Sequence, residues 1–151
     1  MKIDIIIPIY NNINKLNDII TSINSQILPY DANTRIIIVN DGSEKDTYTK
    51  LINIFSHLVD DIIHHEKNLG RSSSRNSGCN SGTGKIIILL DSECIPQGKF
   101  FILAHLPPVS GKLPHEQKPV IRGGRRFMHE IFTRTERVGV EEDDATAQSV
   151  Y

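Results

Sequence analysis

Apolar residues follow two alternating patterns along the chain. Runs rich in aliphatic residues occur at 3–9, 36–39 and 86–90, and a mixed run occurs at 60–66. Short runs rich in β-branched residues and bounded by turn-forming residues predict strands. Because three of these runs are apolar on both faces, they are typical of a parallel sheet that is covered on both sides.

Between the runs, apolar residues recur at intervals of three and four, which is the spacing of an amphipathic helix. The first such helix is predicted after Asn11 or Asn12, either of which is a candidate N-cap, and the second after a capping box formed by Ser43 and Asp46. The expected buried faces are Ile13, Leu16, Ile19, Ile20, Ile23 and Ile27 in the first helix, and Tyr48, Leu51, Ile52, Phe55 and Leu58 in the second.

The remaining elements are predicted from weaker signals. The small, polar stretch 67–84 predicts one weak helix and the stretch 97–106 another, while 118–124 predicts a short strand and 126–137 a helix. Strands that alternate with helices indicate an α/β fold with a mostly parallel sheet flanked by helices. Ligands of such folds bind beyond the carboxyl ends of the strands. We therefore expect a site in the loops at 8–12, 40–46, 66–76 and 91–96, all of which are polar.

Composition narrows the class of protein. The chain has 151 residues and a net charge of −1, so it fits a single domain and lacks the basic excess of a nucleic-acid binder. No apolar run reaches the roughly 20 residues of a membrane span, and Asp4 and Pro8 interrupt the N-terminal run, which argues against a signal peptide. Cys79 and Cys94 make no disulfide or metal framework. We expect a cytoplasmic protein, and peripheral docking on the inner face of the membrane stays open.

The composition changes near residue 105. All eleven asparagines lie at or before Asn80, and the excess of lysine over arginine reverses after this point. We therefore expect two parts, a sheet domain at 1–105 and a C-terminal segment of undetermined structure at 106–151. Whether the second part completes the domain that the first begins stays open.

Polar residues after the strands supply candidate chemistry. Asp41 directly follows a strand, and its carboxylate suits hydrogen bonds from a base or a ribose, although Asp-Gly-Ser is also ordinary turn and capping chemistry. Asp91 and Glu93 follow the strongest strand, where two carboxylates suit Mg²⁺ or Mn²⁺ with a diphosphate, although such pairs often only meet water. In a helix, Arg71 and Arg75 would share a face and could meet phosphate, the alternative being two solvated arginines.

Other common sites find no support in the pattern. The six histidines have no ligand-like spacing, and His64 and His65 would face opposite sides of a strand. The segment "SGTGK" precedes a strand instead of opening a helix, so it does not match a phosphate-binding P-loop.

Four segments in order carry a family resemblance: "IIIPIYNN", "IIIVNDGSEKDT", "EKNLGRSSSRNSG" and "GKIIILLDSE". Over residues 1 to about 105, this series resembles the N-terminal half of a family 2 glycosyltransferase. The resemblance implies a Rossmann-like GT-A fold, a nucleotide-sugar donor, most often a UDP sugar, and a Mn²⁺ or Mg²⁺ cofactor. It also implies an acceptor that is a sugar, a lipid-linked sugar or a polysaccharide. The frequent use of isoleucine, asparagine and lysine suggests, by analogy, a bacterial polysaccharide pathway.

The resemblance also implies roles for single residues. Pro8 and Tyr10 match the motif that lines the nucleobase pocket, and Asp41 matches the aspartate that binds the base. Arg75, with Arg71 nearby, matches the arginine segment near the nucleotide. Asp91 and Glu93 match the D-x-D motif at the ribose, metal and diphosphate, with Glu93 where the family more often has aspartate.

The general base of inverting transfer is expected further along the chain. In the family it is an acidic residue of the second half, and "GVEEDDATAQ" is the acidic cluster downstream here, with Asp143 as the candidate. A solvated acidic tail is the competing interpretation of that cluster. The sequence therefore favours a metal-assisted glycosyltransferase. A non-catalytic nucleotide-sugar-binding module, an inactive remnant and a nucleotidyltransferase are the alternatives, and the last lacks its glycine-rich basic signature after the first strand.

Overall fold

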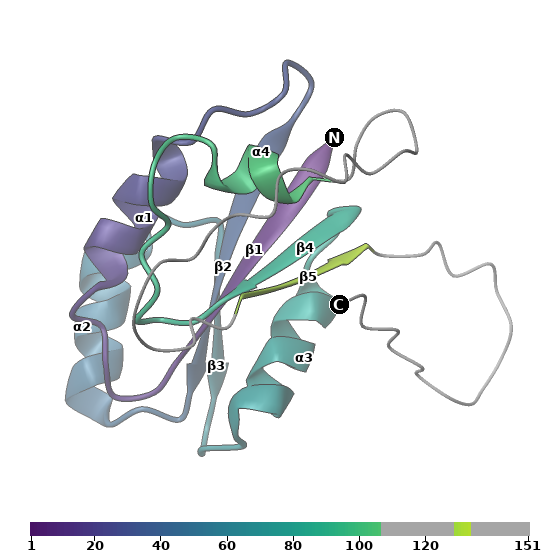
Figure 1. The fold of residues 1–151 in the computed structure, drawn as a ribbon. Coiled ribbons are helices and arrows are strands. Elements are labelled where there is room, and N and C mark those ends of the chain that lie inside the picture. The colour runs from purple at the N-terminus through teal and green to yellow at the C-terminus, as the bar shows by residue number, and fades with distance from the viewer. Residues whose placement is uncertain (107–128, 134–151) are drawn as a thin grey trace, which may run out of the picture.

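The computed structural model describes residues 1–106 and 129–133 (Figure 1). The described residues form one sheet with the strand order β3-β2-β1-β4-β5. The strands β1 to β4 are parallel, and β5 pairs antiparallel with β4. In chain order the elements are β1 (Lys2–Ile9), α1 (Leu16–Asn24), β2 (Asn33–Asp41), α2 (Lys45–Phe55), β3 (Asp61–His65), α3 (Arg71–Ser81), β4 (Ile86–Leu90), α4 (Phe101–His105) and β5 (His129–Thr133).

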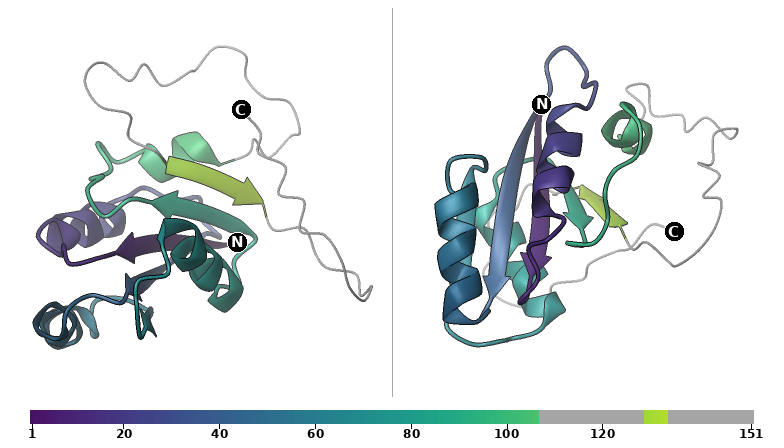
Figure 2. Two further views of the ribbon diagram at one scale, coloured as in Figure 1. Left: turned by 90° about the horizontal axis from the view of Figure 1, so that it is seen from below. Right: turned by 90° about the vertical axis from the view of Figure 1, so that its left-hand side faces the viewer.

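Helices cover both faces of the sheet, as the apolar strands predict. The helices α1 and α2 lie on one face and α3 lies on the other (Figure 2). Successive residues of β1 alternate between the faces: Ile5 and Ile7 join the core under α1 and α2, and Ile6 joins the core under α3. The prediction of a mostly parallel α/β sheet flanked by helices is confirmed.

The core under α1 and α2 is built from large aliphatic side chains. Leu16, Ile19, Ile20 and Ile23 of α1 are buried, as the three-and-four spacing predicts. The helix α1 ends at Asn24, so Ile27 lies beyond it and is 45% exposed. Because the next segment turns back toward β2, the helix is shorter than the apolar pattern suggested. In α2 the buried residues are Leu51 and Phe55, while Leu58 lies past the helix end and is exposed.

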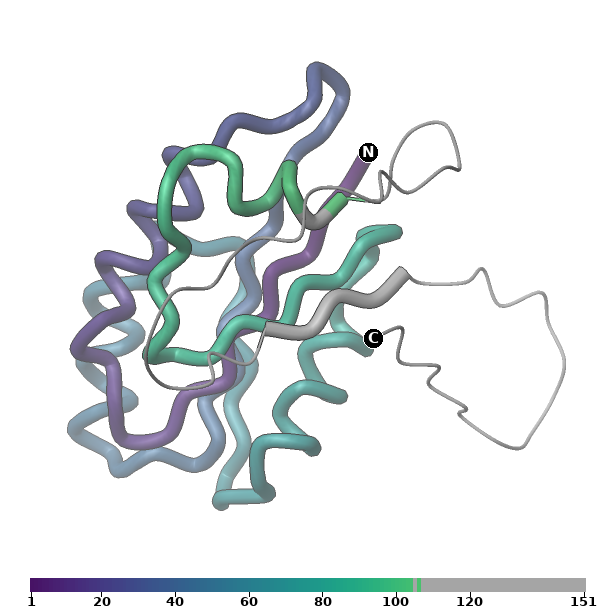
Figure 3. The backbone as a smooth tube through the Cα atoms, viewed as in Figure 1, coloured from purple at the N-terminus to yellow at the C-terminus, as the bar shows by residue number. Residues whose placement is uncertain are grey.

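The chain after β4 returns along α1 and then enters α4 (Figure 3). Ser22 Oγ donates to the carbonyl of Pro96 at 2.5 Å, and the N–H of Ile27 donates to the carbonyl of Lys99 at 2.7 Å. Ile102 of α4 is buried in the same core as α1. The predicted helix at 97–106 is therefore present as the short helix α4.

The helix α3 packs against the sheet through small residues. Its buried positions are Ser74 and Gly78, and a Cβ at Gly78 would lie 2.4 Å from Ile6 Cγ2. Real Cβ atoms do not approach a neighbour so closely, so only glycine allows this distance between helix and sheet. The weak helix predicted over 67–84 is confirmed, and its small residues explain how close to the sheet it lies.

Both predicted N-caps are wrong. The N-cap of α1 is Lys15, and the N-cap of α2 is Glu44; neither makes a side-chain capping hydrogen bond. The hydroxyl of Ser43 instead accepts the N–H of Asn11 at 2.9 Å, from the loop after β1. The side chain that local sequence assigned to a helix end is therefore used to join two loops.

The helix predicted over 126–137 is also wrong, because residues 129–133 form strand β5. The strand pairs with β4 from Ile86 to Leu90, all five of which are buried. A buried strand whose outer edge lacked a neighbour would leave backbone N–H and C=O groups without partners. The need to pair the backbone groups of β4 therefore outweighs the helical spacing of apolar residues over 126–137. The strand predicted at 118–124 lies outside the described residues.

Within 1–106 and 129–133, no helix has the length and the apolar character needed to cross a membrane.

Candidate functional site

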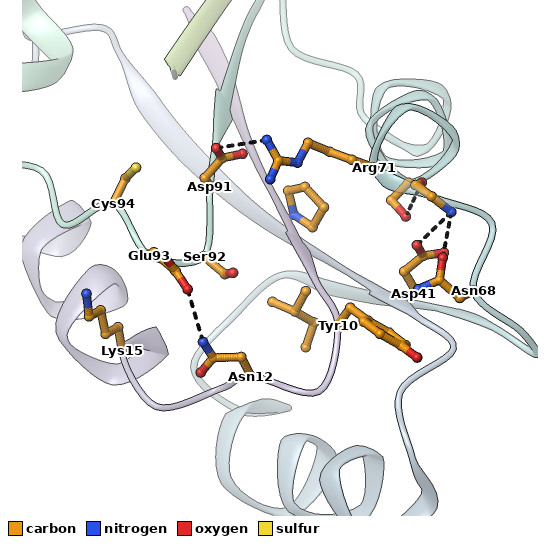
Figure 4. A pocket seen from close by; sticks show the side chains of 14 residues that line it. Tyr10, Asn12, Lys15, Asp41, Asn68, Arg71, Asp91, Ser92, Glu93 and Cys94 are labelled. Atoms are coloured by element: carbon orange, nitrogen blue, oxygen red, sulfur yellow. Dashed lines mark hydrogen bonds and ion pairs between the residues drawn. The ribbon is translucent and has the colours of Figure 1, made fainter. Parts of the chain in front are cut away.

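A pocket of about 690 Å³ opens where the loops after β1, β2, β3 and β4 meet (Figure 4). Parallel strands deliver their carboxyl ends to one edge of a sheet, which is where ligands of α/β folds bind. Six residues predicted from sequence line this pocket: Pro8, Tyr10, Asp41, Arg71, Asp91 and Glu93. The structure therefore brings four separate segments of the sequence to one place.

Asp41 ends β2, and its carboxylate organises the loop that precedes α3. Its Oδ1 accepts the N–H of Leu69 and its Oδ2 accepts the N–H of Gly70, each at 2.9 Å. These amides stand at the start of α3, where a negative charge is stabilised by N–H groups that have no partner within the helix. Asp41 therefore fixes the position at which α3 begins.

His65 holds the same carboxylate from β3. The parallel register pairs Asp41 with His65, and His65 Nδ1 lies 2.9 Å from Asp41 Oδ1. Because a carboxylate only accepts, this bonding pattern assigns the proton to Nδ1. His65 Nε2 lies 2.8 Å from the Ser77 hydroxyl of α3. The imidazole thus joins β2, β3 and α3 below the pocket.

The pKa of Asp41 lies below its ordinary value of 3.8. Burial by itself would raise the pKa, but the hydrogen bonds from His65 and from the amides of Leu69 and Gly70 together outweigh it. Asp41 is therefore a carboxylate at neutral pH, although its side chain is only 6% exposed.

Asp91 follows β4 and faces two arginines of α3. Arg75 Nη2 lies 3.1 Å from Asp91 Oδ1. Arg71 Nη1 lies 3.5 Å from Asp91 Oδ2 (Figure 4). The two arginines share a helix face, as their spacing predicts. The side chain of Arg75 is 13% exposed and that of Arg71 61%. Arg75 is thus part of the wall behind the pocket, whereas Arg71 extends into solvent at its rim.

Glu93 stands on the opposite side of the pocket from Asp41. Its Oε1 accepts a hydrogen bond from Asn12 Nδ2 at 3.4 Å, which joins the loop after β4 to the loop after β1 (Figure 4). Glu93 is exposed. Its carboxylate is therefore open to a ligand in the pocket.

Cys94 lies beside these acids. Burial, followed by the negative charges of Asp91 and Glu93, raises the pKa of its thiol above the ordinary value. Both Cys94 and Cys79 are free cysteines.

The loops after β2 and β3 touch through their backbones at Gly42. This residue has a φ of +68°, and a Cβ placed on it would lie 2.2 Å from the carbonyl carbon of Lys67. Any side chain would force the two loops apart. The glycine of the Asp-Gly-Ser segment thus serves contact between two loops of the protein.

The sequence predictions for single residues fare unevenly. Arg75 contacts the site through Asp91 and does not line the pocket, and Asp143 lies outside the described residues. The spacing of the histidines along the chain does not indicate a role for His65. Its position at the end of a strand next to the one that ends in Asp41 was the available signal. The lining residues that the sequence does not predict are Ile9, Asn12, Lys15, Asn68, Gly70, Ser74, Ser92 and Cys94.

No cluster of three or more histidine, cysteine, aspartate or glutamate side chains with metal-binding geometry occurs in the described part of the chain. Asp91 and Glu93 are the two acids that line the pocket beyond β4. A metal held here would need further oxygen ligands from a bound molecule or water.

Comparison with known proteins places this geometry in a family. The sequence model described as Glycosyl transferase family 2 matches residues 4–106. An uncharacterized glycosyltransferase of Bacillus subtilis, YwdF, is 33% identical over 114 residues, which are 75% of this chain and 38% of that protein. The glycosyltransferase GlyA of Streptococcus pneumoniae is 36% identical over 93 residues, which are 61% of this chain and 13% of that protein. The chain thus spans well under half the length of these curated relatives.

Solved structures support the same fold. The mannosyltransferase PcManGT of Pyrobaculum calidifontis, solved with GDP-Man and Mn²⁺, aligns with a TM-score of 0.55 at 18% identity, covering 65% of this chain and 29% of that one. TarS 1–349 of S. aureus, solved with UDP-GlcNAc, aligns with a TM-score of 0.52 at 22% identity, covering 62% of this chain and 27% of that one. These likenesses show a GT-A fold. The family match over residues 4–106 shows in addition that the chain belongs to glycosyl transferase family 2.

Proposed function

We propose that this chain binds a nucleotide-sugar donor, with UDP as its nucleotide, in the pocket beyond the strands and takes part in transferring the sugar to an acceptor. The observation that carries the proposal is the pocket itself. In a chain of this family, it places the half-exposed ring of Tyr10 and two acids, Asp91 and Glu93, around one cavity of about 690 Å³. TarS, a structural neighbour, was solved with UDP-GlcNAc and with UDP.

The nucleobase would lie between Tyr10 and Asp41. Tyr10 is 51% exposed and lines the pocket, so its ring face is available for stacking on a base. Asp41 accepts three hydrogen bonds from Leu69, Gly70 and His65. The side chain of Ser74 is a further hydrogen-bond partner of this carboxylate, and an N–H of the base would approach Asp41 from the side that lines the pocket. Pro8 would form the floor of this part of the pocket.

The diphosphate would lie toward Asp91 and Glu93. We propose that Glu93 and Asp91 hold Mg²⁺ or Mn²⁺ together with phosphate oxygens, since this cation is commonly bound by one or two carboxylates plus a substrate phosphate. The donor set fits, because Glu93 is exposed and both acids line the same pocket. When bound, the metal would supply charge neutralisation for the departing diphosphate. Arg71, at the rim, would add a positive charge near the same phosphates, and Arg75 would hold Asp91 in place.

Transfer itself would be a single inverting displacement. For this step we propose Asp143 as the general base and a sugar, a lipid-linked sugar or a polysaccharide as the acceptor. Replacement of Asp143 by asparagine is the direct test: donor affinity is expected to stay unchanged while transfer to the acceptor is lost. Retained transfer would remove Asp143 from the mechanism and leave donor binding intact.

The proposed donor site is tested by calorimetric titration of UDP with and without Mn²⁺. The parent chain should bind UDP, and in the presence of Mn²⁺ Asp91→Ala should bind it at least about tenfold more weakly, because a lost charged partner of the metal costs about 1.5–3 kcal/mol. Without Mn²⁺, Glu93→Gln should bind UDP with the affinity of the parent. With Mn²⁺, it should lack most of the increase in UDP affinity that the parent shows. Absence of UDP binding in both metal conditions would refute the proposal.

The matched control is Asp18→Ala, which removes one exposed carboxylate from the first turn of α1. Its UDP affinity should equal that of the parent. An equal loss in Asp18→Ala and Asp91→Ala would mean that the loss does not depend on where the carboxylate lies, which would contradict a role of the pocket. Binding of UDP sugars with neither transfer nor donor hydrolysis would favour the alternative function, a donor-binding module.

A further inference from the structure

Asn11 has an unusual backbone conformation for a residue beside the pocket. Its φ is +53°, and it is the one non-glycine residue with positive φ in residues 1–106 and 129–133. A residue with a side chain pays a conformational cost there, and asparagine pays less than most. Such a conformation persists only when surrounding contacts hold it, and it is often found at binding sites.

The contacts that hold Asn11 all come from the loop between β2 and α2. Its N–H donates to Ser43 Oγ at 2.9 Å, and its Oδ1 accepts the N–H of Glu44 at 2.8 Å. Ser43 is itself fixed, since it is buried and its N–H donates to Asn40 Oδ1 at 3.3 Å. Asn11 is therefore fastened twice, by backbone and side chain, to a rigid neighbour.

The residues on either side of Asn11 both line the pocket, whereas Asn11 does not. Tyr10 presents its ring to the cavity, and Asn12 reaches across to Glu93 at 3.4 Å (Figure 4). The left-handed turn at Asn11 determines the directions in which these two side chains leave the backbone. The contacts with Ser43 and Glu44 thus set where the ring of Tyr10 and the amide of Asn12 stand.

We propose that Asn11 is a positioning residue of the donor site: its double hydrogen bond to Ser43 and Glu44 holds Tyr10 and Asn12 in the arrangement that receives the nucleotide. This inference rests on the proposed function. Preorganisation of this kind raises affinity by removing the entropic cost of ordering the loop when the ligand binds. Asn11 touches no ligand in this scheme and acts through its neighbours.

Two variants of Asn11 separate its hydrogen bond from its backbone conformation. Asn11→Gly adopts positive φ without strain and lacks the acceptor for Glu44, so it isolates the loss of the side-chain bond. Asn11→Asp keeps an acceptor oxygen for Glu44 and tolerates the same φ. Ser43→Ala removes the second bond, and Ser43→Thr restores a hydroxyl at that position.

The expected results concern UDP affinity in the presence of Mn²⁺, measured by calorimetry on the full chain. Asn11→Gly and Ser43→Ala should each weaken binding by roughly three- to tenfold, since a hydrogen bond contributes about 0.5–1.5 kcal/mol. Asn11→Asp and Ser43→Thr should recover most of the parent affinity. The double variant Asn11→Gly/Ser43→Ala should lose less than the sum of the single effects, because both bonds hold the same turn.

A matched control shows whether a change in UDP affinity comes from the loop that contains Asn11 or from a loss of overall stability. Ser81→Ala removes the hydrogen bond from Ser81 Oγ to Asp61 Oδ2, 2.7 Å long, which joins the end of α3 to the start of β3. It should lower the melting temperature as much as Asn11→Gly does while UDP affinity stays at the parent value.

The outcomes distinguish this inference from the proposed function. If the parent chain binds no UDP, the proposed function fails, and the role of Asn11 fails with it. If the parent binds UDP and Asn11→Gly binds it equally well, the positioning role alone is overturned. Equal losses of affinity in Ser81→Ala and Asn11→Gly would also overturn it, since the effect would then follow stability alone.

Discussion

The two faces of the sheet are built by different means. On the face of α1 and α2, large aliphatic side chains fill the space between helix and sheet, and Leu16, Ile19 and Leu51 are at most 1% exposed. On the face of α3, the helix supplies Ser74 and Gly78. Its position depends on close backbone approach, on the hydrogen bond that Asp41 accepts from the N–H of Gly70, and on the contact of His65 with Ser77. The candidate site takes Gly70, Arg71 and Ser74 from the second face. Apolar volume thus supports the fold, while the polar contacts that position α3 also position part of the site.

The largest effect is expected on the apolar face. Ile19→Ala should lower the free energy of unfolding by about 2–5 kcal/mol, because it removes buried methyl groups and leaves a cavity. UDP affinity of the folded fraction should be unchanged. Chemical denaturation and calorimetry check the two parts, with Ile54→Ala, at 46% exposure, as the control that should cost little. A loss of UDP affinity in folded Ile19→Ala would mean that the two faces are not independent.

Asp41→Asn should affect both stability and the site. The variant should lose about 2 kcal/mol of unfolding free energy at pH 7, since hydrogen bonds to a charged group contribute about 1.5–3 kcal/mol each. Because the pKa of Asp41 is lowered in the folded chain, its stabilisation is fully present above the unfolded value of 3.8. It is lost as the pH falls through the folded-state pKa.

The measurement that checks Asp41→Asn is the free energy of unfolding as a function of pH, from about pH 2 to about pH 7, a range that includes the titration of aspartate. The parent should lose stability toward the acidic end more steeply than the variant, and the two curves should converge. Parallel curves would show that Asp41 is not held as a carboxylate by His65 and the α3 amides.

Gly78→Ala should lower the free energy of unfolding less than Ile19→Ala does, but it should affect the candidate site more. Its Cβ would lie 2.4 Å from Ile6 Cγ2, and overpacking of this kind costs about 1–3 kcal/mol. Because α3 would be displaced from the sheet, UDP affinity should fall as well. Ser72→Ala on the exposed side of α3 is the control, since it improves helix propensity and meets no clash. If Gly78→Ala binds UDP like the parent, the position of α3 does not govern the pocket.

The smallest effect on stability is expected for Arg71→Gln. The ion pair of Arg71 with Asp91 spans 3.5 Å at a side chain that is 61% exposed, and such pairs contribute at most about 1 kcal/mol. Arg75→Gln should cost more, because its side chain is 13% exposed and its contact is 3.1 Å. Thermal denaturation of both variants measures the difference. A larger loss for Arg71→Gln would reverse the roles assigned to the two arginines.

The sequence predicted the sheet and its loops because both depend on local signals. Aliphatic runs, three-and-four spacing and the order of strands and helices were enough to place Asp41, Asp91 and Glu93 at one edge. The N-cap assignments failed because these side chains join two loops. The hydroxyl of Ser43 accepts a hydrogen bond from the N–H of Asn11, 32 residues away in the chain. The role of His65 was hidden for the same reason, since it arises from strand register with Asp41. Contacts between loops, and the pairing of β5 with β4, become visible only when the sheet is assembled.

The composition of α3 has a consequence for the order of folding. A helix built mainly of serine, glycine, asparagine and arginine has little tendency to form by itself, and its eleven residues are too few for a stable isolated helix. It gains its hydrogen-bonded structure by docking on a sheet and on a carboxylate that must already be in place. We therefore expect the apolar face to form first and the nucleotide pocket last. The rate at which UDP binding recovers during refolding should then report the docking of α3, the last step of folding.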